Sequence, residues 1–159
     1  MCNFETDKNI WLYEDYVKED KAATRKLFLD RMKEDVKVHD FIISRKKDER
    51  KISVGMAYIW SYNDYRKSWE IGYALLLDHQ KFGYGIESAS LLLKFGFEEL
   101  KAHKIVGMCN SENIGSSKIM QRIGMRREEI FREELFCNGK WTDQCFFSIL
   151  DKEYFDNRR

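Results

Sequence analysis

The chain of 159 residues contains no proline and carries a formal net charge of only +1, with 28 Lys and Arg against 27 Asp and Glu. A proline-rich linker is therefore excluded. Near-neutrality removes the field that draws proteins onto nucleic acid or anionic membranes, so any phosphate binding must be local. No apolar run approaches the roughly 20 residues that a helix needs to cross a bilayer. We expect a soluble protein without nucleic-acid or membrane partners.

Cysteine is also sparse, and it lacks the spacing that would give it a structural role. The four cysteines show no C-x-x-C pair, and the three histidines show no metal-ligand spacing. The first residues contain no apolar stretch typical of a signal peptide. These absences predict a cytoplasmic protein with neither a disulfide framework nor a bound metal.

Material for a core is plentiful, since 43% of the residues are hydrophobic and 14% are aromatic. A chain of this length buries enough surface to fold alone, so we predict one domain over residues 1–159. Apolar periodicity predicts helices over residues 20–36, 86–101 and 116–122. Runs of β-branched and aromatic residues predict strands over residues 40–44, 52–62, 68–76, 105–109, 130–137 and 141–150. The first three strands should form an antiparallel meander, and Asn138-Gly139 predicts a tight hairpin between the last two.

The most informative segment reads Gln80-Lys81-Phe82-Gly83-Tyr84-Gly85 and lies between a predicted strand and the long helix. A glycine-containing loop at a helix start presents free backbone N–H groups, which bind anions such as a diphosphate. Taken alone, the loop favours a plain strand-to-helix turn that uses glycine for its backbone freedom. A dinucleotide-binding G-x-G-x-x-G would need glycine where Ser88 stands, and no G-K-[ST] phosphate loop occurs.

In its context, the loop resembles the acetyl-CoA signature [QR]-x-x-G-x-[GA] of the GNAT superfamily of N-acetyltransferases. The flanking segments fit the same family, in order: Glu70-Ile71-Gly72-Tyr73, Phe95-Gly96-Phe97-Glu98, Asn113-Ile114-Gly115-Ser116 and Ile123-Gly124-Met125. They look most like the branch of ribosomal-protein alanine N-acetyltransferases, which ends in a hairpin similar to that around Asn138-Gly139. The resemblance covers residues 40–153. It implies an α/β (α+β) fold with a mixed, mostly antiparallel central sheet flanked by helices.

The resemblance departs at the N-terminus, where members usually have a strand and a helix before the segment that residues 9–13 resemble. We therefore expect an N-terminally shortened acetyltransferase domain that lacks the family's first strand. A neighbouring strand would then have an unpaired edge. Either a partner subunit, as in a homodimer, or the remaining N-terminal residues would cover it.

The resemblance implies an enzyme that transfers the acetyl group of acetyl-CoA to a primary amine by direct attack in a ternary complex. The acceptor would be a protein N-terminus, a polyamine or a small-molecule amine. Glu70 is the candidate base, acting directly or through a water, although a strand carboxylate without a chemical role fits its position equally well. Many relatives have a tyrosine acid where Met120 stands, and a thioether cannot donate a proton. Ser116 is therefore the candidate proton donor to the leaving thiolate, or else only a helix N-cap.

The family binds the pantetheine arm through backbone N–H groups at a strand end, which correspond here to Leu75, Leu76 and Leu77. Diphosphate binding falls to the glycine loop and the helix start, which comprise Gln80, Lys81, Phe82, Gly83, Tyr84, Gly85 and Ile86. Further cofactor contacts are implied for Asn113, Ser116 and Lys118, although a turn-forming asparagine and a solvated lysine explain two of these equally well. A second interpretation is a catalytically weak or inactive regulatory protein that binds acyl-CoA.

Overall fold

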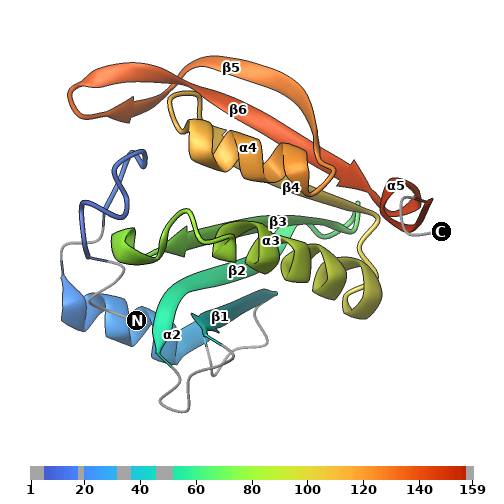
Figure 1. Ribbon diagram of the computed structural model, residues 1–159, viewed down its shortest axis with the longest axis horizontal. Coiled ribbons are helices and arrows are strands. Elements are labelled where there is room, and N and C mark those ends of the chain that lie inside the picture. The colour runs from blue at the N-terminus through green and yellow to red at the C-terminus, as the bar shows by residue number, and fades with distance from the viewer. Residues whose placement is uncertain (1–5, 18–19, 32–36, 46–51, 157–159) are drawn as a thin grey trace.

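A computed structural model describes residues 6–17, 20–31, 37–45 and 52–156 of the chain (Figure 1). Six strands form one sheet in the order β1-β2-β3-β4-β6-β5. Their bounds are β1 (Val38–Ser44), β2 (Ser53–Asn63), β3 (Ser68–Leu75), β4 (Lys104–Asn110), β5 (Arg126–Cys137) and β6 (Lys140–Leu150). β3 and β4 run parallel, and the other four neighbouring pairs are antiparallel. The predicted mixed, mostly antiparallel sheet is thus confirmed.

Helices cover the sheet and cap its ends (Figure 1). They are α2 (Lys21–Arg31), the 3-10 turn η1 (Leu77–His79), α3 (Tyr84–Lys94), its π-helical continuation η2 (Phe95–Glu99), α4 (Ile114–Arg122) and α5 (Asp151–Asp156). α3 packs on β2 and β3, whereas α4 contacts α3, β4 and β5. None of the helices in these ranges is long and apolar enough to cross a bilayer.

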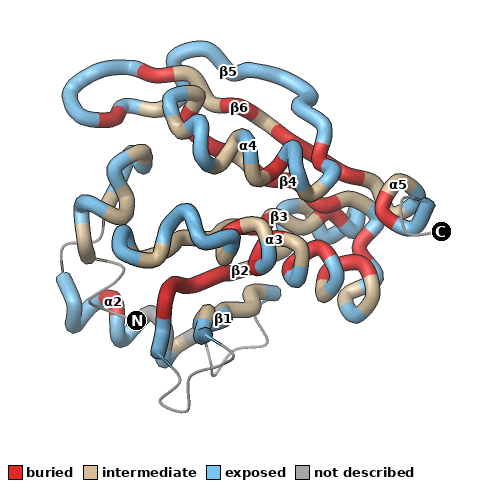
Figure 2. The backbone as a smooth tube through the Cα atoms, in the orientation of Figure 1, coloured by how far each residue is buried: buried red, intermediate tan, exposed pale blue. Residues whose placement is uncertain are grey.

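The core lies between the sheet and the α3–α4 layer, where Figure 2 shows the buried stretches of β2, β4 and β6. Fully buried side chains there include Ile59, Phe97, Ile105, Met120 and Phe147. Met120 packs over Gly107, where an added Cβ would stand 2.8 Å from the methionine sulfur. The residue that replaces the family's tyrosine is therefore a core residue.

The chain before β1 does not extend the sheet as a strand in its described part. Residues 6–17 form turns, and residues 12 and 13 contact β4, the end of β5 and the turn between β5 and β6. The carbonyl of Leu12 accepts a hydrogen bond from Asn138 Nδ2 at 3.1 Å, and the carbonyl of Tyr13 accepts one from Asn110 Nδ2 at 3.4 Å. These hydrogen bonds place residues 12 and 13 beside β4 and the β5–β6 turn, and coverage of an unpaired sheet edge by the N-terminal residues stays a prediction.

Several predicted boundaries need correction. The helix predicted over residues 86–101 begins at Tyr84 and changes to a π-helical turn after Lys94. The helix predicted from residue 116 begins at Ile114, because the cap is Asn113. The predicted hairpin is confirmed, since Asn138 (φ 52°) and Gly139 (φ 78°) both adopt the left-handed conformation that a two-residue turn requires. The charged residues 45–50, which separate the first two predicted strands as a turn, lie mostly outside the described residues.

We predict that Gly55→Ala lowers the free energy of unfolding by about 2 kcal/mol or more. A Cβ at Gly55 would stand 2.3 Å from the carbonyl oxygen of Ala74, so the backbones of β2 and β3 would have to separate. Urea unfolding monitored by circular dichroism measures the change. Gly115→Ala is the control, because its Cβ would meet its nearest neighbour at 3.6 Å and alanine favours the helix. Equal losses in both variants would contradict the prediction.

Candidate active site

β3 and β4 pair only over their first residues, from Ser68 with Lys104 to Glu70 with Val106. β3 then continues to Leu75 against β2, and β4 continues to Asn110 against β6, so the two strands diverge. We call this unpaired stretch between residues 71–75 and 107–110 the fork. Its edges carry backbone N–H and C=O groups that have no sheet partner across the gap, which is the arrangement that an extended ligand needs to pair with a strand.

Only every second residue of β3 directs its backbone N–H group toward the fork. Leu76 donates its N–H to the carbonyl of Val54 at 2.9 Å, on the β2 side. Because successive residues of a strand alternate in direction, Leu75 and Tyr73 direct their N–H and C=O groups toward β4. The expectation that the N–H of Leu76 binds the cofactor is therefore wrong. Leu77 lies beyond the strand, as the first residue of η1.

The glycine loop follows η1 and leads directly into α3. Gly83 is the N-cap of α3 with φ 88°, and no side chain caps the helix there. The N–H groups of the first turn, which include Gly85 and Ile86, therefore have no acceptor within the helix. A Cβ at Gly83 would meet nothing within 4 Å, so the approach to these groups is open. Lys81 has φ 67°, which makes two left-handed residues in one loop, as in anion-binding concavities of the backbone.

Gly85 and Gln80 also have structural roles, and the predicted cofactor contacts of the loop and of Lys118 stay predictions. Gly85 is buried, and a Cβ there would stand 2.7 Å from Ile119 Cδ1, so this glycine permits the contact between α3 and α4. The side chain of Gln80 donates to the carbonyl of Leu75 at 3.4 Å, which fixes the loop on the end of β3. Phe82 is 70% exposed. Lys118 is exposed on α4.

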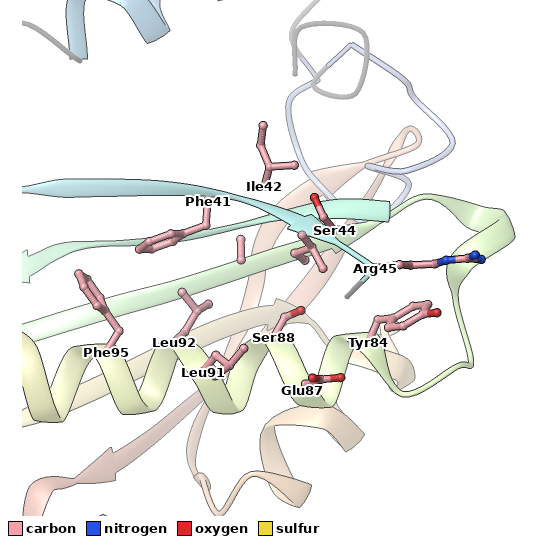
Figure 3. Close-up of a pocket in the computed structure, with 12 residues that line it drawn as sticks. Phe41, Ile42, Ser44, Arg45, Tyr84, Glu87, Ser88, Leu91, Leu92 and Phe95 are labelled. Carbon is pink, nitrogen blue, oxygen red and sulfur yellow. The ribbon is translucent and has the colours of Figure 1, made fainter. Parts of the chain in front are cut away.

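A separate cavity of about 710 Å³ lies between β1 and α3. Figure 3 shows Phe41 facing Phe95 at one end, with Arg45, Tyr84 and Glu87 at the other. Its lining is mostly apolar, and it lies away from β4 and α4. Tyr84, a residue of the predicted cofactor loop, thus also lines this cavity.

Glu70 stands at the vertex of the fork, as the last β3 residue that pairs with β4. Burial, and secondarily the negative charge of Glu14 on the N-terminal segment, raise the pKa of its carboxyl group to about 7. Trp60 lies directly opposite Glu70 on β2, and its ring stacks on that of Tyr58 with centroids 5.2 Å apart. The carboxyl group is thus enclosed, next to an aromatic pair, and half ionised near neutral pH.

Ser116 is not the N-cap of α4. Asn113 has that role, because its side-chain oxygen accepts the N–H of Ser116 at 3.0 Å. The hydroxyl group of Ser116 is therefore not needed for capping, and it lies 3.1 Å from the hydroxyl oxygen of Tyr73. Tyr73 comes from the unpaired stretch of β3, and burial raises the pKa of its phenol, so the hydroxyl stays protonated and able to donate.

Tyr73 is the site residue that sequence reasoning missed, although a signal was present. It follows Glu70 by three positions on one strand, and strand side chains alternate between faces. Glu70 and Tyr73 therefore lie on opposite faces of the sheet, with the fork between them. On the Tyr73 side, Cys109 of β4 has its sulfur 3.3 Å from Ser117 Oγ, so α4 contacts both edges of the fork. Burial raises the pKa of this thiol, which argues against a nucleophilic role.

The arrangement is suited to an acyl transfer that needs no metal ligand set from the protein. Among the described residues, no group of three or more His, Cys, Asp or Glu side chains could hold a metal ion. The fork instead offers backbone donors at its edges, a carboxyl group on one face and a pair of hydroxyl groups on the other.

Comparison with known proteins gives the family to which a chain with this fold belongs. Residues 1–126 match the family model described as Acetyltransferase (GNAT) domain, and the chain belongs to this family. A Bacillus subtilis (strain 168) relative, the uncharacterized N-acetyltransferase YnaD, is 37% identical over 87 residues, which are 55% of this chain and 51% of the relative.

Two further comparisons differ in what they support. The putative ribosomal N-acetyltransferase YdaF of the same Bacillus strain is 26% identical over 100 residues, covering 63% of this chain and 55% of YdaF. The crystal structure of a Vibrio cholerae spermidine N-acetyltransferase in complex with CoA and spermine superimposes with a TM-score of 0.88 at 23% identity, covering 97% of this chain and 89% of the other. This likeness shows the fold alone. The chain spans about half the length of the Bacillus relatives it matches.

We predict that Glu70→Gln raises the free energy of unfolding at about pH 8 but not at about pH 4. The folded state holds the Glu70 proton until about pH 7, whereas the unfolded chain releases it near 4.5, the ordinary pKa of a glutamate side chain. The stabilisation from Glu70 is therefore present at low pH and is lost as the pH rises through 7, where a charge is buried. Glutamine avoids this cost.

Urea unfolding at the two pH values measures the difference between variant and wild type. The control is Glu134→Gln, which replaces an exposed carboxylate on β5 and should match the wild type at both pH values. A Glu70→Gln effect that is independent of pH would contradict the raised pKa.

Proposed function

We propose that this chain is an acetyl-CoA-dependent N-acetyltransferase that moves the acetyl group to a primary amine by direct attack in a ternary complex. The observation that carries the proposal is the fork with Glu70 at its vertex on one face and the Tyr73–Ser116 hydroxyl pair on the other. The pantetheine arm would extend along the open edge of β3, and the diphosphate would lie on the N–H groups at the start of α3.

Each step of the reaction has a group in this arrangement. A primary amine has a pKa near 10 and must lose a proton before or during attack. Glu70, with a pKa of about 7, is ionised enough at neutral pH to accept that proton directly or through a water. A backbone N–H on the open edge of β3 would polarise the carbonyl oxygen, and Ser116 would donate to the leaving sulfur.

The acceptor would approach from the face that bears Glu70, because the cofactor loop and α4 occupy the other. That face combines the carboxyl group with Trp60 and the negative charge of Glu14, which suits a cationic amine. Among amines we place a protein N-terminus first, on the motif resemblance and the YdaF match. Polyamines and small-molecule amines are the other acceptors to compare.

The decisive assay measures thiol release from acetyl-CoA with an alanine-starting peptide, spermidine and a small arylalkylamine as acceptors. Turnover with any acceptor supports the proposal, and the preferred acceptor assigns the substrate class. Saturable acetyl-CoA binding without turnover would favour the regulatory acyl-CoA-binding protein instead. Absence of binding by folded protein would contradict both.

Gly83→Asp should abolish acetyl-CoA binding in a calorimetric titration, because its carboxylate would stand at the open start of α3 and repel the diphosphate. The matched control is Gly83→Asn, which has nearly the same shape and tolerates the left-handed conformation without the charge. We expect Gly83→Asn to retain measurable binding. Equal loss in both variants would assign the effect to backbone strain and would leave no evidence for an anion at this helix start.

The pH dependence of turnover should identify the base. We expect kcat/KM with the preferred acceptor to rise with pH through an inflection near 7, as Glu70 loses its proton. Glu70→Gln should lower kcat/KM by about 100-fold and remove that inflection. Glu134→Gln on β5 should leave the profile unchanged. An inflection that persists in Glu70→Gln would assign it to another group.

A further inference from the structure

The two hydroxyl groups on the α4 face of the fork form a chain that can be arranged in two ways. Tyr73 Oη lies 3.1 Å from Ser116 Oγ and 3.3 Å from the backbone carbonyl oxygen of Ser116. The tyrosine has one hydrogen for these two acceptors. When it donates to the carbonyl group, the serine hydroxyl can donate to the tyrosine. When it donates to Ser116 Oγ, the serine hydrogen is released from Tyr73 and can point elsewhere.

The position of this chain determines what that hydrogen can reach. Tyr73 belongs to the unpaired stretch of β3, and Cys109 belongs to the unpaired stretch of β4. Both contact the first turns of α4, through Ser116 and Ser117 respectively. The start of α4 therefore bridges the fork. Cys109 Sγ lies 3.3 Å from Ser117 Oγ and also hydrogen-bonds with the side chain of Ser116, so the Ser116 hydroxyl can reach a sulfur atom beside the fork.

We propose that Tyr73 is a positioning residue that orients the hydroxyl hydrogen of Ser116 toward the sulfur of the leaving thiolate. The inference rests on the proposed function. It gives Tyr73 of β3 the role of supporting the leaving group. On α4, the position at which many relatives have a tyrosine holds the buried Met120. Asn113 contributes because its side-chain oxygen caps α4 by accepting the N–H of Ser116. The serine hydroxyl group is therefore not used for capping.

The transfer step balances with solvent water as the only other participant, because Glu70 returns to water the proton that the thiolate takes from it. The amine nitrogen forms a bond to the carbonyl carbon, its excess proton passes to Glu70, and the carbon–sulfur bond breaks with its electron pair on sulfur. The resulting thiolate accepts the hydrogen bond from Ser116 and takes a proton from water as CoA leaves. The serine is a hydrogen-bond donor throughout, since an alcohol is a much weaker acid than a thiol.

The first test measures the thiol of bound CoA and needs no acceptor. The ultraviolet absorbance of the thiolate is titrated in the CoA complex, with the desulfo-CoA complex as the blank for the protein's own cysteines. We expect the thiol pKa of CoA to be lower when bound than when free. Tyr73→Phe should raise it part of the way back, and Ser116→Ala should raise it fully. An unchanged pKa in Tyr73→Phe would overturn the proposal.

The second test uses turnover with the preferred acceptor. Tyr73→Phe should lower kcat by about tenfold with the KM for acetyl-CoA unchanged, because the lost hydrogen bond matters mainly as charge develops on sulfur. In a Ser116→Ala background the same substitution should change kcat little. An equal factor in both backgrounds would indicate a packing role and would overturn the proposal.

Tyr154→Phe is the matched control. Its hydroxyl donates to Glu98 Oε1 at 3.0 Å, and the side chain is 5% exposed on α5, away from the fork. It should lose some stability and keep both the thiol pKa and kcat. Absence of turnover in the wild type would contradict the proposed function while leaving the CoA titration as an independent test of Tyr73.

Discussion

The site depends on one constraint, which is that the parallel pairing of β3 with β4 ends as soon as Glu70 has met Val106. Each strand keeps its other neighbour, so the sheet divides into a β1-β2-β3 half and a β4-β6-β5 half without losing the core beneath. The backbone polar groups exposed by this division cannot stay buried without partners. A cofactor that has an extended amide-containing arm supplies such partners, and it is thereby held between two rigid edges.

The same division sets the electrostatics of the site. A carboxyl group at the vertex lies where two strands still enclose it, so its pKa rises toward neutrality without a strongly coupled partner. Three residues further along β3, a tyrosine faces the helices and stays protonated because it too is enclosed. Because side chains alternate between the two faces of a strand, the Glu70 carboxyl group and the Tyr73 hydroxyl group lie on opposite faces of β3. Such a separation suits the proposed reaction, in which the amine attacks the thioester from one side and the thiolate leaves on the other.

Much of this could be predicted from sequence, because local signals are strong where backbone geometry is unusual. Asn138-Gly139 specified its turn, and the segment from Gln80 to Gly85 specified a strand–loop–helix junction. Packing was harder to predict. Gly85 adjoins Ile119, which is distant in sequence, and Asn113 rather than Ser116 caps α4 because its side chain is oriented by the preceding turn. The role of Tyr73 required knowing which strand neighbours it, and the direction of the Leu76 amide required the β2–β3 register.

The N-terminal segment is attached through its main chain: the carbonyl group of Leu12 accepts a hydrogen bond from Asn138, and that of Tyr13 accepts one from Asn110. It brings Glu14 close enough to Glu70 to influence its proton affinity. The proton affinity of the Glu70 carboxyl group is thereby linked to the turn between β5 and β6, so a displacement of that hairpin tip would change the acidity of a side chain on a distant strand.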